Sequence, residues 1–401
     1  MAKLLLLKFF AGFLLCAVML VSCPVETPEQ ENPWDDLDLM EFVSSMKIGW
    51  NLGNTLDAHN NMNPGETFWG NRPATQELIN AVAKQGFGAV RIPVTWGNKV
   101  GDAPDYRIDA DWLERVAEVV EYVRAAEMRA IINIHHDGAD SHYWLSVRTN
   151  ALTGDAKNRI DAQFRSMWTQ IANYFRDSGS FLIFEGFNEL HDGSWGNGSP
   201  AQRERINELN QIFVDAVRAT GGNNGDRFLI VSGWVTRPSL MRHIVMPTDT
   251  VQDRLIANFH YYDPYDFSGS ARWNTWGSKS LTGSNGWANE NYLRNTFNDV
   301  KERFIDNGIP VIIGEYGAVR QASETGKAHR KYYMEYVTKY AHDCGFIPFY
   351  WDNGGANAGS EGFGLFSRRS PYDLLSDAED IIAIMMKAVN EDYPLSEVTP
   401  P

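Results

Sequence analysis

The chain has few cysteines, three among 401 residues. Cys16 lies in an apolar N-terminal segment, Cys23 directly follows that segment, and Cys344 stands alone, so the sequence predicts neither a disulfide framework nor a cysteine-rich metal site. The zinc-binding pattern H-E-x-x-H is also missing. We therefore expect no metal and no cofactor.

Glycine-rich nucleotide motifs and a basic charge balance are missing as well. Neither G-x-G-x-x-G nor G-x-x-x-x-G-K-[ST] occurs, which argues against an open nucleotide-binding sheet. The net charge is −15, and it becomes −17 without residues 1–22, which contain Lys3 and Lys8 and no acid. We expect no nucleic-acid partner, because such partners require basic patches.

The first 22 residues have the pattern of an export signal. Lys3 and Lys8 precede an apolar run, Phe9 to Val21, which is shorter than the about 20 residues of a spanning helix. Leu20-Val-Ser-Cys23 resembles the lipobox of bacterial lipoproteins, which implies cleavage before Cys23 and lipid on its thiol. The expected location is the bacterial cell surface or outer membrane through this anchor alone; an ordinary secretory signal is the alternative.

Residues 23–39 are rich in Pro and Glu and are expected to form a flexible tether. From 40 to 392 the pattern predicts one domain, with 393–401 as a tail. Short apolar runs predict strands at 47–52, 89–94, 129–134, 181–189, 227–231, 255–260, 310–315 and 346–351. Helices are expected at about 75–84, 111–126, 161–175, 201–218, 290–305, 327–342 and 377–389, with a helical turn after Pro238. Eight such alternations predict a single (β/α)8 TIM barrel; an open doubly-wound sheet is the alternative.

Polar residues gather at the C-terminal ends of these expected strands. Ends that only capped a barrel would have no reason to collect Arg, His and Glu, because buried charge is costly unless it is paired or used. In a parallel barrel these ends carry the catalytic groups. The candidate site residues are Asn54, Arg91, His135, His136, Asn188, Glu189, His260, Tyr262, Glu315 and Trp351.

Glu189 and Glu315 are the candidate catalytic pair, because they end the fourth and seventh strands on opposite sides of the barrel. Cleavage of a glycosidic bond needs one protonated carboxyl, which donates to the leaving oxygen, and one ionised carboxylate, which attacks or activates water. We expect Arg91 and a histidine to keep Glu315 ionised, and a drier setting to raise the pKa of Glu189.

Two neighbours of Glu189 on the same expected strand occupy different faces of it. Glu185 shares a face with it by strand alternation but lies about 13 Å deeper, so we expect Glu185 to pair with Arg91 or to plug the barrel floor. Alternation points Asn188 away from Glu189, so a substrate contact by Asn188 requires the strand to bulge or bend there.

The pair His135-His136 also suggests a metal, but adjacent strand residues point to opposite faces and chelate poorly. Hydrogen bonds to sugar hydroxyls, or orientation of a carboxylate, suit these imidazoles better.

Several tryptophans lie in expected loops, where they either pack in the core or offer flat apolar surfaces to sugar faces. They are Trp69, Trp96, Trp144, Trp195, Trp273, Trp276 and Trp287. The acidic chain fits a neutral polysaccharide, which needs no counter-charge.

Six stretches together resemble glycoside hydrolase family 5, and most of all its subfamily 4 of endo-glucanases. They are Gly49-Trp-Asn-Leu-Gly-Asn-Thr-Leu-Asp57, Val90-Arg-Ile-Pro-Val-Thr-Trp96, Ile134-His-His-Asp137, Phe184-Glu-Gly-Phe-Asn-Glu189, His260-Tyr-Tyr262 and Ile313-Gly-Glu-Tyr316. The resemblance implies a retaining mechanism with Glu189 as acid/base and Glu315 as nucleophile. It also implies a scissile-bond subsite lined by Arg91, His135, Asn188, His260, Tyr262 and Trp351.

Two positions depart from the family pattern without altering a reacting group: Leu190, where Pro is frequent, and Tyr316, where Phe is frequent. The implied substrate is a β-1,4-glucan such as a cellulose-like chain, mixed-linkage glucan or xyloglucan. We expect the protein to be a monomer. A β-mannanase or glucomannanase would use the same catalytic pair. A surface glycan-binding lipoprotein without turnover is the alternative from another class.

Overall fold

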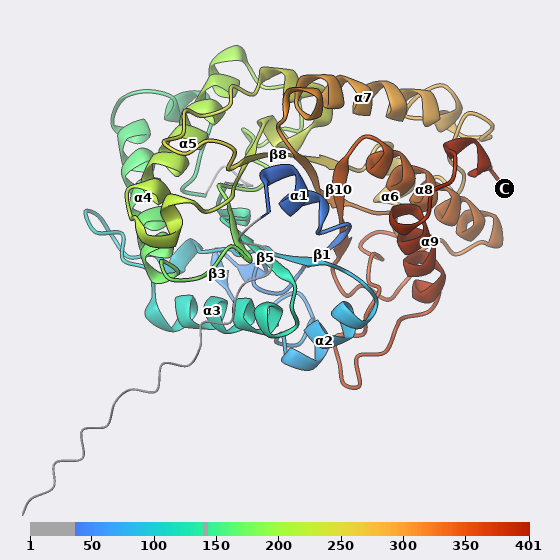
Figure 1. Cartoon of the computed structure of the whole chain (residues 1–401), viewed down its shortest axis with the longest axis horizontal. Helices are drawn as coiled ribbons and strands as arrows, with labels where there is room; N and C mark the ends of the chain where they lie inside the picture. The colour runs from blue at the N-terminus through green and yellow to red at the C-terminus, as the bar shows by residue number, and fades with distance from the viewer. Residues whose placement is uncertain (1–36, 139–142) are drawn as a thin grey trace, which may run out of the picture.

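The computed structural model describes residues 37–138 and 143–401, and Figure 1 shows helices surrounding a central set of strands. Eight parallel strands close into a barrel in the order β1-β10-β9-β8-β7-β6-β5-β4. They are β1 (Gly49–Leu52), β4 (Ala89–Ile92), β5 (Arg129–Asn133), β6 (Leu182–Glu185), β7 (Leu229–Ser232), β8 (Leu255–Tyr261), β9 (Val311–Tyr316) and β10 (Phe346–Asp352). The expected (β/α)8 barrel is confirmed, since each expected strand overlaps one of these.

The helices pack their apolar faces on the outside of the barrel. They are α2 (Gln76–Lys84), α3 (Ala110–Ala125), α4 (Gly154–Tyr174), α5 (Pro200–Arg218), α6 (Tyr265–Ser268), α7 (Glu290–Arg303), α8 (Glu324–Asp343) and α9 (Ala378–Asn390). A small hairpin, β2 (His59–Asn60) with β3 (Asn63–Pro64), follows β1. In residues 37–138 and 143–401, no helix is long and apolar enough to cross a membrane.

Local sequence explains where several helices begin. The α5 helix starts with a capping box, in which Ser199 accepts from the backbone of Gln202 and the Gln202 side chain accepts from the backbone of Ser199. Pro200 occupies the first turn, where its missing N–H has no helical partner to lose. The α4 helix begins at Gly154 rather than near Asp161, because its first turns are too polar to show an apolar period.

One end of the barrel is closed by α1 (Leu39–Ser44), which Figure 1 shows across the centre of the ring of helices. Leu39, Phe42 and Val43 pack on barrel residues such as Ile131 and Ile312 in one buried cluster. The Phe42 ring stacks on Phe228 with centroids 3.9 Å apart. The cluster fills the lower barrel, so the interior is accessible from the opposite end.

Two boundaries differ from the expected ones. The packed domain includes residues 37–39, because Leu37 packs on the floor cluster and Asp38 caps α1 through the Glu41 N–H at 2.8 Å. The segment 393–401 is not a free tail, since Tyr393 and Val398 are buried in the main core. The expected signal, Cys23 and the tether up to residue 36 lie outside the described residues.

Candidate active site

A layer of buried polar side chains crosses the barrel above its floor. Arg91 on β4 lies at its centre, with Nε 2.6 Å from Oε2 and Nη2 3.0 Å from Oε1 of Glu185. Nη1 donates to Asn51 Oδ1 at 3.0 Å. Asn133 and Asn258 donate to the same Glu185 carboxylate at 3.3 and 3.1 Å. Glu185 is therefore the buried partner of Arg91, as its expected depth predicted.

A bulge in β9 brings Glu315 to the barrel mouth. The β8–β9 register shifts between Phe259 and His260, which leaves Gly314 as the extra residue before Glu315. A Cβ on Gly314 would lie 2.5 Å from Oδ1 of Asn258, whereas the Gly314 N–H donates to that oxygen at 2.9 Å. Ile312 points into the barrel, so strict alternation along β9 would turn Glu315 outward. The extra residue at the bulge turns the Glu315 side chain inward instead.

The Glu315 carboxylate is buried and held by two donors. Its Oε1 accepts from Arg91 Nη1 at 2.8 Å, and its Oε2 accepts from the Tyr262 hydroxyl at 3.1 Å. Nε2 of His135 lies 3.9 Å from Oε1. A guanidinium and a hydroxyl that both donate to one carboxylate favour its ionised form.

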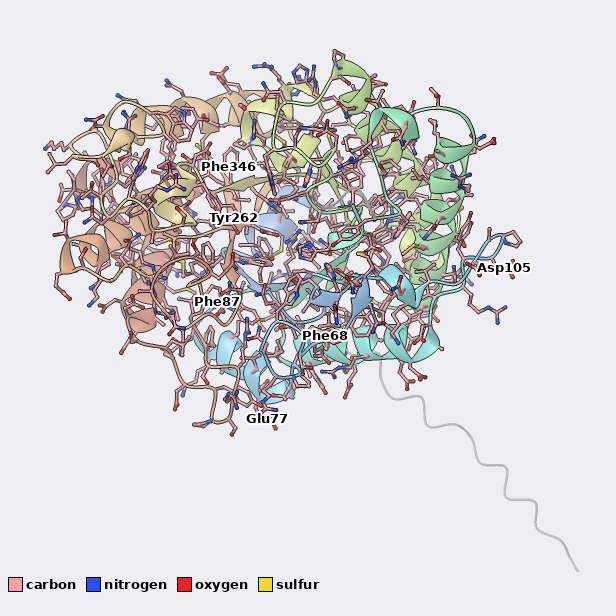
Figure 2. The ribbon with its side chains drawn as sticks, turned by 180° about the vertical axis from the view of Figure 1, so that it is seen from behind. Phe68, Glu77, Phe87, Asp105, Tyr262 and Phe346 are labelled. Atoms are coloured by element: carbon pink, nitrogen blue, oxygen red, sulfur yellow. The ribbon has the colours of Figure 1, made fainter. Side chains whose placement is uncertain are left out.

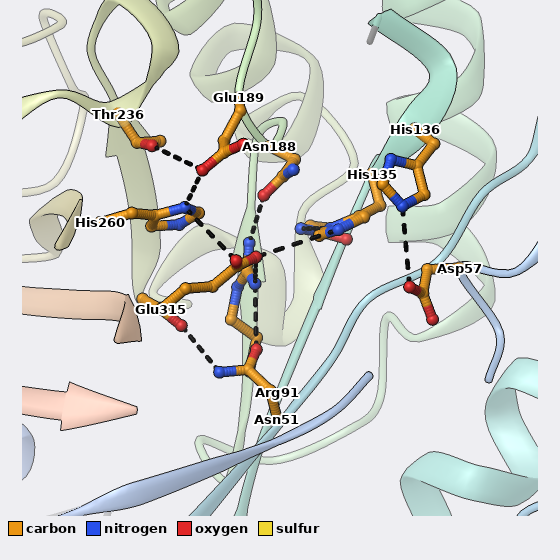
Figure 3. A network of polar contacts seen from close by, with 12 residues as sticks. Asn51, Asp57, Arg91, His135, His136, Asn188, Glu189, Thr236, His260 and Glu315 are labelled. Atoms are coloured by element: carbon orange, nitrogen blue, oxygen red, sulfur yellow. Dashed lines mark hydrogen bonds and ion pairs between the residues drawn. The ribbon is translucent and has the colours of Figure 1, made fainter. Parts of the chain in front are cut away.

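Glu189 follows β6 at a point where the chain has left the strand ladder. Its Oε1 lies 2.7 Å from Nδ1 of His260, and the Thr236 hydroxyl donates to the same oxygen at 3.4 Å. Asn188 also points inward and accepts from Arg91 Nη2 at 2.8 Å (Figure 3). The expected strand 181–189 thus ends at Glu185, and the irregular segment after it supplies the bend that Asn188 needs.

The Glu189 and Glu315 carboxylates come close together beside His260. One oxygen of each acid and a ring nitrogen of His260 lie within 4.8 Å of one another, and Figure 3 shows the imidazole next to both acids. The two acids predicted as a pair from separate strand ends are therefore neighbours across the barrel mouth.

The loop that carries Thr236 has a strained backbone. Val235 and Thr236 have φ of +46° and +49°, a region that β-branched residues rarely occupy. The Val235 N–H donates to the Leu190 carbonyl at 3.0 Å, which fastens this loop next to Glu189. Strain of this kind persists where surrounding contacts enforce it, and it concentrates at functional sites.

Burial dominates the electrostatics of both acids. It raises the pKa of Glu189, against smaller opposing effects of Arg91 and His136, as expected for a proton donor. Burial also raises the pKa of Glu315, and His260 and Arg91 oppose it only in part, which is opposite to the expected direction. The difference between the acids lies in their contacts, because Arg91 donates to Glu315 and not to Glu189.

The groups around the two acids keep their neutral forms. Burial lowers the pKa of His260 to about 4 and that of His135 well below its ordinary value. Burial, followed by the charge of Glu315, raises the pKa of Tyr262 well above 10. Tyr262 therefore stays protonated and can donate to Glu315.

The rings of His135 and His136 converge. The prediction that these two side chains point to opposite faces is therefore wrong. The chain leaves β5 at Asn133, and the two rings lie edge to face with centroids 4.4 Å apart. With Asp57 they offer three possible ligand atoms within 4.8 Å. Asp57 already accepts from the Asn54 and Thr55 N–H groups, and we assign no metal to the three.

The remaining candidates lie around the mouth. The Trp351 ring stacks parallel to His135 with centroids 6.0 Å apart, and Tyr262 meets Phe363 edge to face; Figure 2 shows Tyr262 near the middle of the molecule. Asn54 has φ of +55° and fixes the β1 loop through its backbone. No hydrogen bond of the Asn54 side chain occurs within the part of the chain that the structure describes.

Several residues of the network were missed from the sequence: Asn51, Asp57, Asn133, Thr236 and Asn258. Three of them, Asn51, Asn133 and Asn258, are amides inside otherwise apolar strands, two or three residues before a predicted site residue, and this was a usable signal. Thr236 lies in an irregular loop and gave none.

The loop tryptophans divide into three groups by exposure. Trp96 and Trp276 are fully buried, and Trp144 and Trp273 are half-buried. Trp69, Trp195 and Trp287 are exposed. Trp69 lies beside His136 and Trp195 beside His191, with centroids 5.3 and 4.7 Å apart, so these two indoles flank the site and suit sugar faces.

A closed (β/α)8 barrel with two close carboxylates at its mouth defines an enzyme of the glycoside hydrolase class. The family model described as cellulase (glycosyl hydrolase family 5) matches residues 53–357. The chain belongs to glycosyl hydrolase family 5.

Known relatives cover most of the chain. An endoglucanase A of Paenibacillus barcinonensis is 37% identical over 83% of this chain and 86% of its own length. A xyloglucan-specific endo-β-1,4-glucanase of Bacteroides ovatus is 35% identical over 88% of this chain and 71% of its own. A solved structure named a GH5-4 broad specificity endoglucanase, from Bacteroides salanitronis, has a TM-score of 0.84 and 47% identity, and the match covers 88% of this chain and 96% of that one.

Proposed function

We propose that the protein is a retaining endo-β-1,4-glucanase that hydrolyses β-glucans of the cellulose-like, mixed-linkage or xyloglucan type. The retaining mechanism is supported by the closeness of Glu189 and Glu315, since one carboxylate oxygen of each lies within 4.8 Å of the other. Retaining enzymes hold their carboxyls about 5–5.5 Å apart, whereas inverting enzymes hold them about 6.5–9.5 Å apart to admit water. The names of the relatives support the substrate class.

In the proposed first step, Glu315 attacks the anomeric carbon while Glu189 donates its proton to the leaving oxygen. Arg91 and Tyr262, which donate to Glu315, orient the nucleophile for this attack. The glycosidic bond breaks and a glycosyl–Glu315 ester forms. Glu189, now ionised, then takes a proton from water, and that water displaces Glu315 with the original anomeric configuration.

The test measures reducing-end release on barley β-glucan, xyloglucan, carboxymethyl-cellulose and glucomannan. Wild type is compared with Glu315→Ala and with Glu324→Ala, a control at an exposed glutamate of α8. We expect release on at least one glucan by wild type and the control only, with NMR showing unchanged anomeric configuration in the first product. Preferred release from glucomannan would support a mannan-type enzyme. Retarded migration in glucan gels without release would support a glycan-binding protein.

We also propose that the protein is exported and carries lipid on Cys23, which rests on the charged start, the apolar run and Leu20-Val-Ser-Cys23. The test is incorporation of a labelled fatty acid in a bacterial host. Labelling of wild type and not of Cys23→Ser would support the lipoprotein, and a secreted, unlabelled wild type would support an ordinary signal.

A further inference from the structure

Two hollows meet at Arg148. The smaller one, about 240 Å³, contains Glu189 together with His136, Asn188 and Trp195, and we call it the catalytic hollow. The larger one, about 700 Å³, lies between the segment 97–106 on one side and the segment 143–151 with the start of α4 on the other, and is called the side hollow. Arg148 lines both. Figure 2 shows Asp105, from the first of these loops, at the edge of the molecule.

The guanidinium of Arg148 is available to a ligand. Its backbone N–H donates to the Ser146 hydroxyl at 3.3 Å, and its side chain has no hydrogen-bond or ion-pair partner among residues 37–138 and 143–401. Gly193 makes room for it, because a Cβ there would lie 2.1 Å from Nη2 of Arg148, and Gly193 has φ of +92°. A half-buried cation with five N–H donors and no carboxylate can donate to neighbouring hydroxyls.

The side hollow has the composition of a sugar site. Its lining includes the aromatic residues Tyr106 and Trp144 and the amide residues Asn98 and Asn150. One N–H of the Asn98 amide donates to the Asn61 carbonyl at 3.0 Å. Its volume lies within the range of about 300–1,000 Å³ that is typical of small-ligand pockets. Aromatic faces for the apolar side of a sugar, together with amide and guanidinium donors for its hydroxyls, are the groups that a neutral saccharide requires.

The position of the two hollows relative to Glu189 indicates which part of the substrate lies in each. The catalytic hollow is lined by Glu189 and not by Glu315, and a proton donor lies beside the leaving group. A β-1,4-linked backbone is extended and needs a continuous groove. The side hollow instead adjoins the catalytic hollow at Arg148, the residue that the two linings share, so it suits a unit that branches from the backbone there.

We propose that the side hollow binds a neutral saccharide branch on the leaving-group side of the glucan, and that Arg148 is the specificity-determining residue that holds the branch. This inference rests on the proposed function. It predicts that the enzyme prefers branched over unbranched glucans, and that this preference depends on Arg148 and the side hollow.

The experiment compares kcat/KM on tamarind xyloglucan, which is branched, with kcat/KM on unbranched cellohexaose and cellotetraose. Two variants change the side hollow in different ways. Arg148→Ala removes the guanidinium donor, and Ala156→Trp places a large side chain of α4 in the space. Arg165→Ala is the matched control, because Arg165 is exposed on α4 and lines neither hollow. We expect both variants to lose about tenfold on xyloglucan, the size of one lost charged hydrogen bond. Ala156→Trp, at a residue that does not line the catalytic hollow, should keep wild-type rates on both oligosaccharides, and Arg148→Ala should lose much less on them than on xyloglucan.

Equal losses on xyloglucan and the oligosaccharides, or no loss on any, would overturn the inference. A loss on cellohexaose but not on cellotetraose would also overturn it, since the side hollow would then hold backbone. Binding of xyloglucan heptasaccharide by Glu189→Gln, with and without Arg148→Ala, is measured by calorimetry and needs no turnover. An unchanged Kd there contradicts the inference, whereas an inactive wild type that still shows the Kd difference contradicts only the proposed function.

Discussion

His260 Nδ1 lies 2.7 Å from Oε1 of Glu189, and its Nε2 is buried without a hydrogen-bond partner in the described chain. Burial lowers the pKa of this imidazole to about 4, so it is neutral at the pH where Glu189 must carry a proton. A neutral ring with its proton on Nε2 can accept a hydrogen bond from protonated Glu189 at Nδ1, and a neutral ring with its proton on Nδ1 can donate one to ionised Glu189. In either tautomer His260 contacts Glu189 without adding a charge to the site.

The buried His260 predicts a loss of stability in acid. Its folded pKa of about 4 lies below the ordinary 6.5, so the unfolded state binds more protons between these values, and the free energy of unfolding falls as pH is lowered through that window. The contribution is at most about 3 kcal/mol at 1.36 kcal/mol per pKa unit. Urea unfolding at pH 8 and pH 4 should show a smaller pH-dependent loss in His260→Asn than in wild type. An equal loss would mean that His260 is not the group responsible.

Replacement of the proton donor should depend on the leaving group. Glu189→Gln is expected to lower turnover of glucans by about 10²–10⁴-fold, the usual contribution of general acid–base catalysis. For aryl cellobiosides whose phenol leaves without protonation, the loss in kcat/KM, which reports the first step, should be much smaller, whereas kcat stays low because the second step still lacks its base. Steady-state rates on a series of such aryl substrates measure this, and a loss that is uniform across the series would remove Glu189 from the acid role.

Thr236 should influence the alkaline limb of the pH–rate profile. Its hydroxyl donates to Glu189 and lowers the pKa of that acid. Without the hydroxyl, Glu189 should keep its proton to higher pH, so the alkaline limb of kcat/KM moves upward in Thr236→Val. Thr236→Ser retains the hydroxyl and is the control. A limb that moves equally in both variants would point to the strained backbone rather than the hydrogen bond.

Arg91 should be required for stability as well as activity. Arg91→Gln leaves the Glu185 carboxylate fully buried without a cation, and breaking a buried pair in this way costs about 3–5 kcal/mol. Chemical denaturation measures the change. The double variant Arg91→Gln with Glu185→Gln should regain part of the stability but no activity, because Glu315 still lacks the hydrogen bond and the charge of Arg91 and keeps only the Tyr262 donor. Full recovery of turnover would contradict the orienting role of Arg91.

The floor of the barrel should affect stability alone. Phe42→Ala removes a fully buried ring that stacks on Phe228, and such truncations cost about 3–5 kcal/mol. The kcat of the folded fraction should stay at the wild-type value, since α1 lies at the end of the barrel remote from Glu189. Thermal unfolding and activity at low temperature separate the two effects, and a change in kcat would show coupling from floor to mouth.

The sequence was sufficient to predict the (β/α)8 barrel, because its buried strands appear as short apolar runs and the helices between them are amphipathic. It also placed Glu189, Glu315 and Arg91 near one another, since parallel strands end at one face. It failed where the backbone departs from alternation. The bulge at Gly314, the bend after Glu185 and the convergence of His135 with His136 depend on long-range contacts that no local pattern contains.

Because α1 closes one end of the barrel, the two ends of the molecule differ. The chain enters the folded domain at the closed end, where Leu37 packs on the floor, and the two carboxylates lie at the other end. The N-terminal segment therefore joins the folded domain at the end of the barrel opposite the two carboxylates. A long polymer can enter the mouth without meeting the point where that segment joins.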